Sequence, residues 1–228
     1  MVLSITSLEN KFKKSMLLFF TILSLIFFID GKLAFGNEVF IARDSSNPQR
    51  TPPLKWLKKF TWYYSDYAEP SWLSKPGIDL FMVASKAWEN CGVEIEFLGG
   101  SHSPTLEKNN INVMGWIENP SQKLRGITLR TPEKGSQPIA LHEADVGINS
   151  LNLQLKNNPR LLQKVIIHEF GHALGLIHSN YCNDVMSSAS ACGALIAPLP
   201  PIEPTINDIA QCNSLYKNNS DDTDTPLR

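Results

Sequence analysis

No predominantly apolar run in the sequence is long enough to cross a bilayer. The longest, MLLFFTILSLIFFI, has fourteen residues and begins at Met16, whereas a membrane-spanning helix needs about 20. Lysines precede this run and small residues follow it in KLAFGN, which is the pattern of a secretory signal. We therefore predict a signal peptide over residues 1–36 and a secreted or extracytoplasmic remainder. The alternative is an uncleaved N-terminal membrane anchor, although Asp30 and Lys32 end the run early.

The sequence also lacks an excess of positive charge. Beyond residue 36 it has seventeen basic and twenty acidic residues, a net charge of −3. No basic patch indicates a nucleic-acid partner. There is no internal repeat, and 228 residues suffice for one domain with a substantial core. We expect a monomer with one folded domain.

Cysteines are few, and none forms a CxxC pair, which makes a metal site built from cysteines the less favoured interpretation. The four are Cys91, Cys182, Cys192 and Cys212, all in the exported part. An even number in an oxidising compartment predicts two disulfides, for which three pairings exist. We favour Cys182 with Cys192, because a short loop joins them, and this choice leaves Cys91 for Cys212.

The pattern of apolar residues and turn signals predicts one domain over residues 55–218. Residues 37–54 are polar and contain proline, which predicts an extended lead-in outside the core, and the polar tail 219–228 is predicted to be disordered. Strands are predicted at Lys59–Ser65, Cys91–Phe97, Ile111–Trp116, Gly126–Arg130 and Ala144–Asn149. Helices are predicted at Gly77–Asn90, from the cap Asn158 and Pro159 to the stop at Gly175, and at Ile206–Lys217.

Three of the chain's five histidines lie within eleven residues, in the stretch VIIHEFGHALGLIHSNYCNDVM. His168 and His172 are four residues apart on the predicted long helix, so their side chains share one face. Glu169 is the next residue round the helix, which places its carboxylate beside a shared metal ion rather than on it. Gly175 allows the chain to turn after the helix and bring His178 to the same ion.

Three neutral imidazoles leave one tetrahedral position open, as in catalytic zinc sites. Zinc would lower the pKa of a water molecule towards about 7, and Glu169 would take its proton during attack on a peptide carbonyl and then pass it to the leaving amine. We therefore predict a secreted zinc-dependent metalloendopeptidase. Two alternatives remain: histidines in ordinary core or surface contacts, and a secreted binding or inhibitor module that keeps zinc for stability without protease activity.

The stretch HEFGHALGLIHS resembles the zinc signature of the metzincin endopeptidases. In that group a methionine in a tight turn lies beneath the histidines, and Met186 has the spacing typical of the matrixin branch, eight residues after His178. Ser179, directly after the third histidine, also matches matrixins. The stretch KWLKKFTWYY, the helix at residues 77–90 and the stretch PTINDIAQCNSLYK are similar to matrixin elements, so the resemblance covers roughly residues 55–217.

This resemblance implies the metzincin fold, an α+β domain of the α/β type. Its sheet is twisted, five-stranded and mostly parallel with one antiparallel edge strand, and it is accompanied by an active-site helix and a C-terminal helix. By position, Gly126–Arg130 would be the edge strand. Its free edge would then pair with an extended protein or peptide substrate.

The sequence departs from the matrixin pattern on both sides of the signature. No cysteine precedes residue 60, so the cysteine switch PRCGxPD that usually blocks the zinc is absent. Asp44 could act as a carboxylate plug instead, although a solvated position in the lead-in is the commoner role. Ser187 and Ser188 follow Met186 where matrixins usually have Tyr-Pro, which leaves the specificity pocket, expected within residues 187–201, undefined.

Structural metal sites have little support in the sequence. His102 and His142 do not fit the structural zinc site of the family, and we expect both to be exposed or to play a supporting role. Asp145 could join a Ca²⁺ site, but a lone aspartate at the end of a strand is more often a surface charge.

Overall fold

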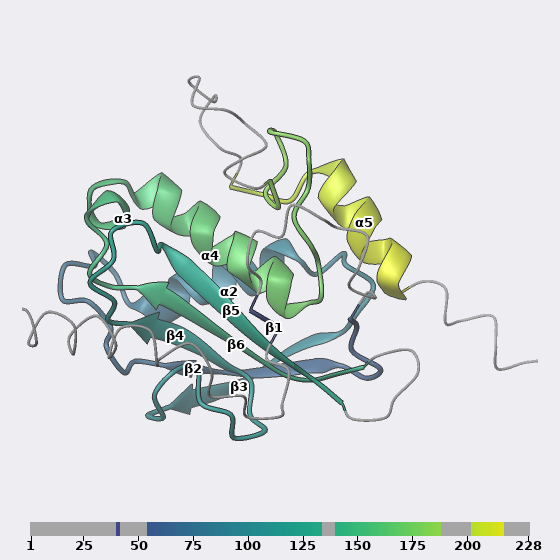
Figure 1. Cartoon of the computed structure of the whole chain (residues 1–228), viewed down its shortest axis with the longest axis horizontal. Coiled ribbons are helices and arrows are strands. Elements are labelled where there is room, and N and C mark those ends of the chain that lie inside the picture. The colour runs from purple at the N-terminus through teal and green to yellow at the C-terminus, as the bar shows by residue number, and fades with distance from the viewer. Residues whose placement is uncertain (1–39, 42–53, 134–139, 188–201, 217–228) are drawn as a thin grey trace, which may run out of the picture. The chain divides into compact units, whose positions relative to one another are not determined.

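A computed structural model describes residues 40–41, 54–133, 140–187 and 202–216, all within the compact unit Val39–Arg228 (Figure 1). The predicted signal peptide, Asp44, Ser188, Cys192 and the predicted disordered tail lie outside the described residues. Within the described part of the chain, no helix is both long enough and apolar enough to cross a membrane.

One sheet forms the framework of the domain. Its strands lie in the order β1-β5-β6-β4-β2-β3. Strands β3, β2, β4 and β6 run parallel to one another, whereas β5 runs antiparallel to β6. Strands β2 to β6 confirm the predicted five-stranded, mostly parallel sheet with one antiparallel strand at its side, and β1 adds a sixth strand. The bounds are β1 Phe40–Ile41, β2 Phe60–Ser65, β3 Ile95–Ser101, β4 Val113–Ile117, β5 Gly126–Pro132 and β6 Leu141–Asn149.

The short strand β1, which was not predicted, pairs with the outer side of β5. Phe40 lies opposite Arg130 and Ile41 opposite Leu129, in antiparallel register. An unpaired strand edge is a template for further pairing, and here the chain's own lead-in uses part of it. The predicted free edge of β5 is therefore covered at its Leu129–Arg130 end, while no strand among the described residues pairs with the outer side of Gly126–Thr128.

Four helices are present among the described residues: α2 Gly77–Ala87, α3 Leu153–Asn157, α4 Pro159–Ala173 and α5 Ile206–Tyr216. Helix α2 ends at Ala87, three residues earlier than predicted, and Trp88 is its C-cap. The short helix α3 was not predicted, because five residues show no clear periodicity. Its start is capped by Asn152, whose side chain accepts hydrogen bonds from the backbone N–H groups of Gln154 and Leu155.

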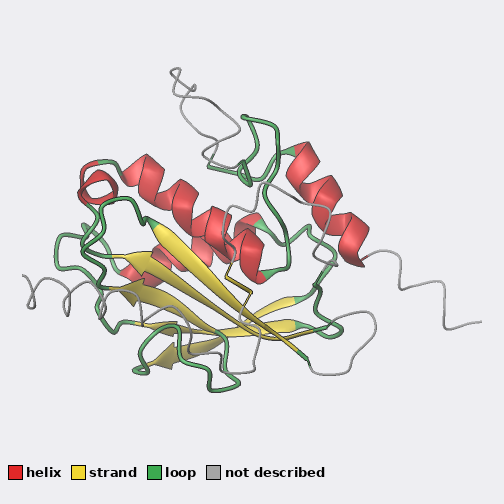
Figure 2. Cartoon of the chain, viewed as in Figure 1, coloured by secondary structure: helices red, strands yellow, loops and turns green. Residues whose placement is uncertain are grey.

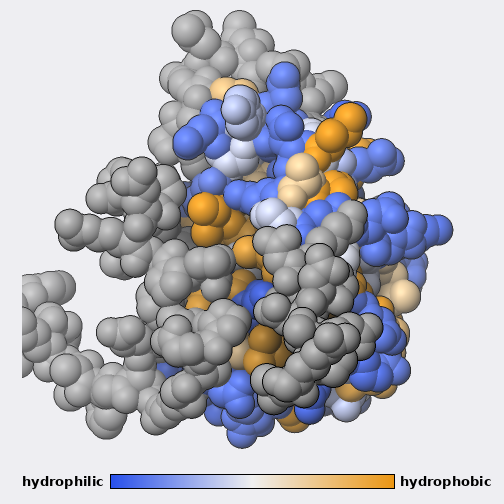
Figure 3. Space-filling view, turned by 90° about the vertical axis from the view of Figure 1, so that its right-hand side faces the viewer, coloured by the Kyte–Doolittle hydropathy of each residue, from blue (hydrophilic) through white to orange (hydrophobic). Residues whose placement is uncertain are grey.

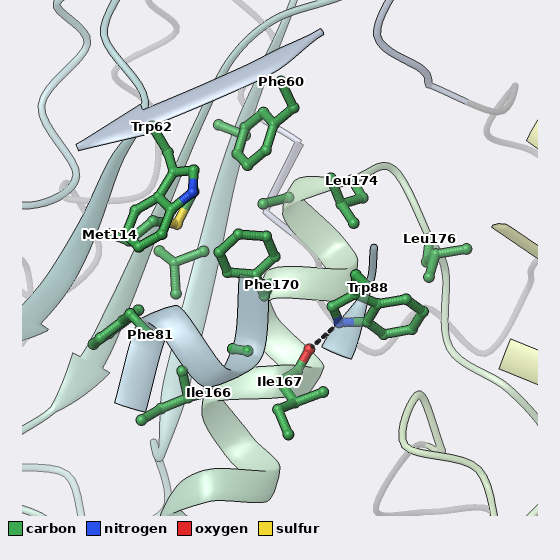
Figure 4. Packing of buried hydrophobic residues seen from close by; sticks show 14 of the residues in the cluster. Phe60, Trp62, Phe81, Trp88, Met114, Ile166, Ile167, Phe170, Leu174 and Leu176 are labelled. Carbon is green, nitrogen blue, oxygen red and sulfur yellow. Dashed lines mark hydrogen bonds between the residues drawn. The ribbon is translucent and has the colours of Figure 1, made fainter. Parts of the chain in front are cut away.

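Helices α2 and α4 lie on one face of the sheet, and the core fills the space between (Figure 2). Phe170 of α4 packs edge-on against Phe60 and Trp62 of β2, with ring centroids 5.8 and 5.6 Å away. The Trp88 indole N–H donates to the backbone oxygen of Ile167 at 2.9 Å (Figure 4). Truncating Phe170 to alanine would cost about 3–5 kcal/mol of stability. This packing fixes α4, which carries two of the predicted metal ligands.

Leu54 belongs to this core, contrary to its predicted place in the polar lead-in. Its side chain is 2% exposed, and the neighbouring Lys55 accepts a backbone hydrogen bond from Leu141 at 2.8 Å. Burying the apolar Leu54 side chain is favourable in free energy, and this effect places Leu54 in the core even though prolines precede it in the sequence. The folded domain thus begins at least as early as Leu54.

Helix α5 is attached to the domain by a disulfide and a buried hydrogen bond. Cys91 and Cys212 form a disulfide with Cα atoms 5.1 Å apart, as predicted. The Tyr216 hydroxyl donates to the backbone oxygen of Leu174 at 2.6 Å, just beyond α4. Cys182 is partly buried, and its predicted partner Cys192 lies outside the described residues, so that pairing stays a prediction.

The surface shown in Figure 3 is mixed: hydrophobic residues stand between hydrophilic ones in its described part. Exposed apolar side chains include Ile206 at 89% and Tyr181 at 67%. Scattered exposure of this kind is ordinary for soluble domains and does not by itself indicate a partner.

Candidate active site

The start of α4 is set by local capping, as the sequence predicts. The Asn158 side chain accepts a hydrogen bond from the backbone N–H of Leu161, and Pro159 occupies the first helical position. With the helix fixed at this end, His168 and His172 lie one turn apart on the same side of it.

The end of α4 is a tight turn at Gly175. The N–H of Gly175 donates to the His172 oxygen at 2.9 Å, and that of Leu176 donates to the Gly171 oxygen at 3.1 Å. This pair of bonds is the Schellman pattern, which requires a left-handed residue, and Gly175 has φ +97°. A side chain at Gly175 would also collide with the backbone oxygen of Leu54. The turn sends the chain back towards α4.

The three histidines converge on one point. The Nε2 atoms of His168 and His172 are 3.1 Å apart. The Nε2 atom of His178 lies 3.2 Å from that of His172 and 3.3 Å from that of His168. His172 is almost fully buried, and the other two are half-buried. Among the described residues, these three form the group of side chains that could hold a metal ion.

The 3.1 Å contact between Nε2 of His168 and Nε2 of His172 is not a hydrogen bond, because the opposite nitrogens of these two rings carry the protons. Nδ1 of His168 lies 2.7 Å from the backbone oxygen of Val185, and Nδ1 of His172 lies 2.8 Å from that of Leu176. Both Nδ1 atoms must therefore donate, which leaves lone pairs on the Nε2 atoms facing one another. With zinc–nitrogen distances of 2.0–2.1 Å, a tetrahedral ion needs ligand nitrogens about 3.3 Å apart. The residues present fit zinc.

Burial keeps these imidazoles neutral. It lowers the pKa of His168 to about 4, although the hydrogen bond to Val185 opposes the shift. It also lowers the pKa of His172 well below its ordinary value, with further lowering from the neighbouring histidines. At neutral pH both rings are therefore ready to bind a cation without first losing a proton.

Met186 lies in a turn packed against α4. Its side chain is fully buried, and a Cβ placed on Gly171 would fall 2.5 Å from the Met186 sulfur. The backbone oxygen of Met186 accepts from the Ser179 N–H at 2.7 Å, and Ser179 pairs with Ser187 as an isolated bridge. The segment directly after His178 is thereby joined to the Met186 turn.

Two buried aspartates hold this turn, and sequence reasoning missed both. Asp208 accepts from the backbone N–H groups of Val185 at 2.9 Å, Met186 at 3.2 Å and Thr205 at 2.8 Å. Asp184 accepts from the Ser179 hydroxyl at 2.5 Å and the Thr205 hydroxyl at 2.7 Å. The sequence contains a weak signal for Asp208 only. It lies three residues after Thr205, which is the spacing of a capping box at the start of a helix.

Glu169 is buried beside the histidines and held by Thr128 of β5. The Thr128 hydroxyl lies 2.7 Å from the Glu169 carboxylate oxygen Oε2. Burial raises the pKa of Glu169 to about 7, opposed by this hydrogen bond and by the positive charge of buried Arg130. Sequence analysis did not predict the contact of Thr128 with Glu169 or the effect of the Arg130 charge on it.

The remaining candidates lie away from the histidines. His102 and His142 are exposed and contact Asp66 and Asn110, respectively, which agrees with the expectation. Asp145 was expected to be a surface charge, and this expectation is wrong. It is 2% exposed and accepts a hydrogen bond from the backbone N–H of Val113 at 2.8 Å. This bond joins β6 to β4.

The comparison with protein families gives a match to most of the folded domain. The family described as matrixin matches residues 75–217, a range that includes α2, the three histidines, Glu169, Met186 and α5. No curated protein matches the chain. The family match covers more than half of the sequence and agrees with the sheet order and with the histidine group. The chain therefore belongs to the matrixin family of zinc metalloendopeptidases.

Proposed function

We propose that this matrixin is a secreted endopeptidase in which His168, His172 and His178 bind the catalytic zinc and Glu169 is the general base. The observation that carries the proposal is the convergence of three Nε2 atoms within 3.3 Å of one another. Two of the rings are oriented by backbone oxygens. Such support of a ligand's other ring nitrogen is typical of metal-binding histidines.

When bound, zinc supplies Lewis-acid chemistry, because it polarises the scissile carbonyl and lowers the pKa of a water molecule. The Glu169 carboxylate accepts a proton from the attacking water, whose oxygen bonds to the carbonyl carbon. Glu169 then gives the proton to the amide nitrogen as the carbon–nitrogen bond breaks. The products are a carboxylic acid and an amine. Burial raises the pKa of Glu169, which makes its carboxylate a stronger base, while the hydrogen bond from Thr128 and the charge of Arg130 oppose this shift.

The proposed substrate is a protein or peptide in extended conformation, paired with the outer edge of β5. Thr128 on this strand reaches Glu169, and Gly126 approaches the same side chain, so the edge runs past the proposed base. Backbone pairing would provide affinity that depends little on sequence. Because β1 covers Leu129 and Arg130, such a substrate would use Gly126–Thr128 or displace β1.

Secretion is proposed from the basic and apolar N-terminal segment, and the Cys91–Cys212 disulfide suits an oxidising compartment. The alternative function, a zinc-stabilised binding or inhibitor module, would use the same metal ligands without chemistry. Retention of a buried carboxyl beside the histidines favours the endopeptidase, because burying such a group has a cost that a binding module need not bear.

Zinc removal and restoration test the proposal. The purified protein is incubated with a panel of unfolded protein substrates, before and after chelation, and again after zinc is returned. We expect cleavage that is lost on chelation and recovered with zinc. Cleavage that persists after the metal has been removed would contradict the proposed mechanism, and a complete lack of cleavage across the panel would favour the binding module. Mapping the cleavage sites would also define the specificity pocket.

A further inference from the structure

The side chain of Thr128 is buried between β5 and α4. Thr128 is 1% exposed, and its hydroxyl oxygen lies 2.7 Å from the Glu169 carboxylate oxygen Oε2 and 3.0 Å from the Glu169 backbone oxygen. Thr128 and Glu169 are 41 residues apart in sequence. Within the described part of the chain, no other side chain forms a hydrogen bond with the Glu169 carboxyl.

Gly126 constrains the same glutamate from a second position on β5. A Cβ at Gly126 would lie 2.8 Å from the Glu169 Cγ and 3.0 Å from its Oε1. The methylene stem of Glu169 therefore lies directly against the Gly126 backbone, and its Oε2 end lies against Thr128. Gly126 and Thr128 are two positions apart on one strand and therefore lie on the same face. Together they hold the methylene stem and the Oε2 end of the Glu169 side chain.

The Thr128 hydroxyl has one proton and two acceptors within reach. It can donate to Oε2 while Glu169 is a carboxylate. When the proton is on Oε1, Oε2 remains an acceptor, so the Thr128 hydroxyl can keep the same hydrogen bond in either state. The carboxyl thus need not move when it takes up or releases a proton.

We propose that Thr128 is a positioning residue that holds Glu169 in one orientation throughout the reaction cycle. This inference rests on the proposed function, in which Glu169 first accepts a proton and then gives it to the leaving amine. Oε2 is engaged by Thr128, and Oε1 is the oxygen that exchanges the proton with water and substrate. A base that is held near the reactive position supports a faster reaction than one that rotates freely, because it is misplaced less often.

Substitutions at Thr128 separate the hydroxyl from the shape of the side chain. Thr128→Val keeps the branched shape and removes the hydroxyl, whereas Thr128→Ser keeps the hydroxyl. Thr131 lies on the same strand but on its opposite face, so Thr131→Val is the control for a threonine-to-valine change in β5. We expect Thr128→Val to lower kcat about 10- to 100-fold with KM and zinc content little changed, which is less than the ~10²–10⁴-fold contribution of a base itself. Thr128→Ser should restore most of kcat.

A second arm measures the contact without activity. Urea unfolding of the Thr128→Val, Glu169→Ala and double variants gives a double-mutant cycle, and we expect the two changes to be non-additive. Should Thr128→Val not fold, Thr128→Ala replaces it. Additive changes, a kcat equal to that of the wild type in Thr128→Val, or a loss in Thr128→Ser as large as in Thr128→Val would overturn the inference. If the wild type itself is inactive while the cycle shows coupling, the proposed function is wrong, and with it the positioning role, although the contact is real.

Discussion

The Nδ1 atom of His168 lies 2.7 Å from the backbone oxygen of Val185, so the turn that contains Met186 orients the first histidine of the group. The N–H of the same residue, Val185, donates to the buried carboxylate of Asp208 at 2.9 Å. One backbone residue therefore connects a proposed metal ligand on α4 to helix α5. The geometry of the histidines depends on the C-terminal helix as well as on the signature.

Replacing His178 by alanine should weaken zinc binding strongly and leave the domain folded. The side chain is half-buried at the end of a turn, whereas the core is formed by the sheet, α2 and α4. Two remaining imidazoles cannot make the three-ligand site of a catalytic zinc. Zinc content after dialysis, together with a thermal unfolding curve, checks this expectation. His102→Ala is the control because His102 is exposed, and an unchanged zinc content in His178→Ala would remove His178 from the ligand set.

Replacing Asp208 by asparagine should reduce both stability and zinc affinity. The carboxylate accepts from three backbone N–H groups, and the amide has only one oxygen to do so. We expect a loss of about 1–3 kcal/mol in the free energy of unfolding. Zinc affinity should fall about tenfold, because Asp208 supports the Val185 oxygen that orients His168. Denaturant unfolding and a competition titration with a zinc chelator measure the two effects.

Glu118→Gln is the matched control for the loss of one acidic charge, because Glu118 is exposed. Stability and zinc affinity equal to those of the Glu118→Gln variant would show that Asp208 does not support the site.

Asp145 should make stability fall as pH rises. Burial raises its pKa to about 8, above its ordinary value of 3.8, so the folded state holds the proton more tightly than the unfolded state. The unfolded chain binds fewer protons between these values, and the free energy of unfolding decreases across this window by at most about 1.4 kcal/mol per pH unit. The variant Asp145→Asn keeps an acceptor for the Val113 N–H and cannot ionise. Its stability relative to the wild type should therefore increase from pH 4 to pH 8.

Unfolding of both proteins by urea at a series of pH values gives this difference directly. A constant difference over the window would mean that Asp145 ionises in the folded state as easily as it does in water.

Disrupting β1 should improve the cleavage of extended substrates. If substrates pair with β5, they compete with Phe40 and Ile41 for its edge. Proline has no N–H to donate and is poorly tolerated in a paired strand, so Phe40→Pro with Ile41→Pro should free the edge and lower KM. Alanine at both positions keeps the backbone N–H groups and should have a smaller effect. Steady-state kinetics with a peptide substrate compare the three proteins, and equal KM values would argue against competition at this edge.

The signature region could be predicted well because its parts are local. The capping of α4 by Asn158, the turn at Gly175 and the convergence of the histidines all depend on residues within one short segment. The parallel strands followed from their apolar runs and from the resemblance to matrixins.

The supporting contacts could not be predicted, because they join distant segments. Thr128 reaches Glu169 across 41 residues, and Asp208 reaches Val185 across 23. In the sequence, Thr128 is only one residue of a predicted strand. Asp145 was misjudged for the same reason, since its partner Val113 lies 32 residues away on another strand. The pairing of β1 involves two residues, which is too few to give a periodic signal.

In the proposed mechanism, zinc held by three histidines and a base at Glu169 together carry out peptide hydrolysis. The most direct test is kcat/KM for one peptide substrate, measured for the wild type and for Glu169→Gln at equal zinc content. The amide is close in size to the carboxylate but cannot accept the proton, so we predict one zinc per chain in both proteins and a loss of about 10²–10⁴-fold in kcat/KM. Equal kcat/KM values at equal zinc content would show that Glu169 is not the base.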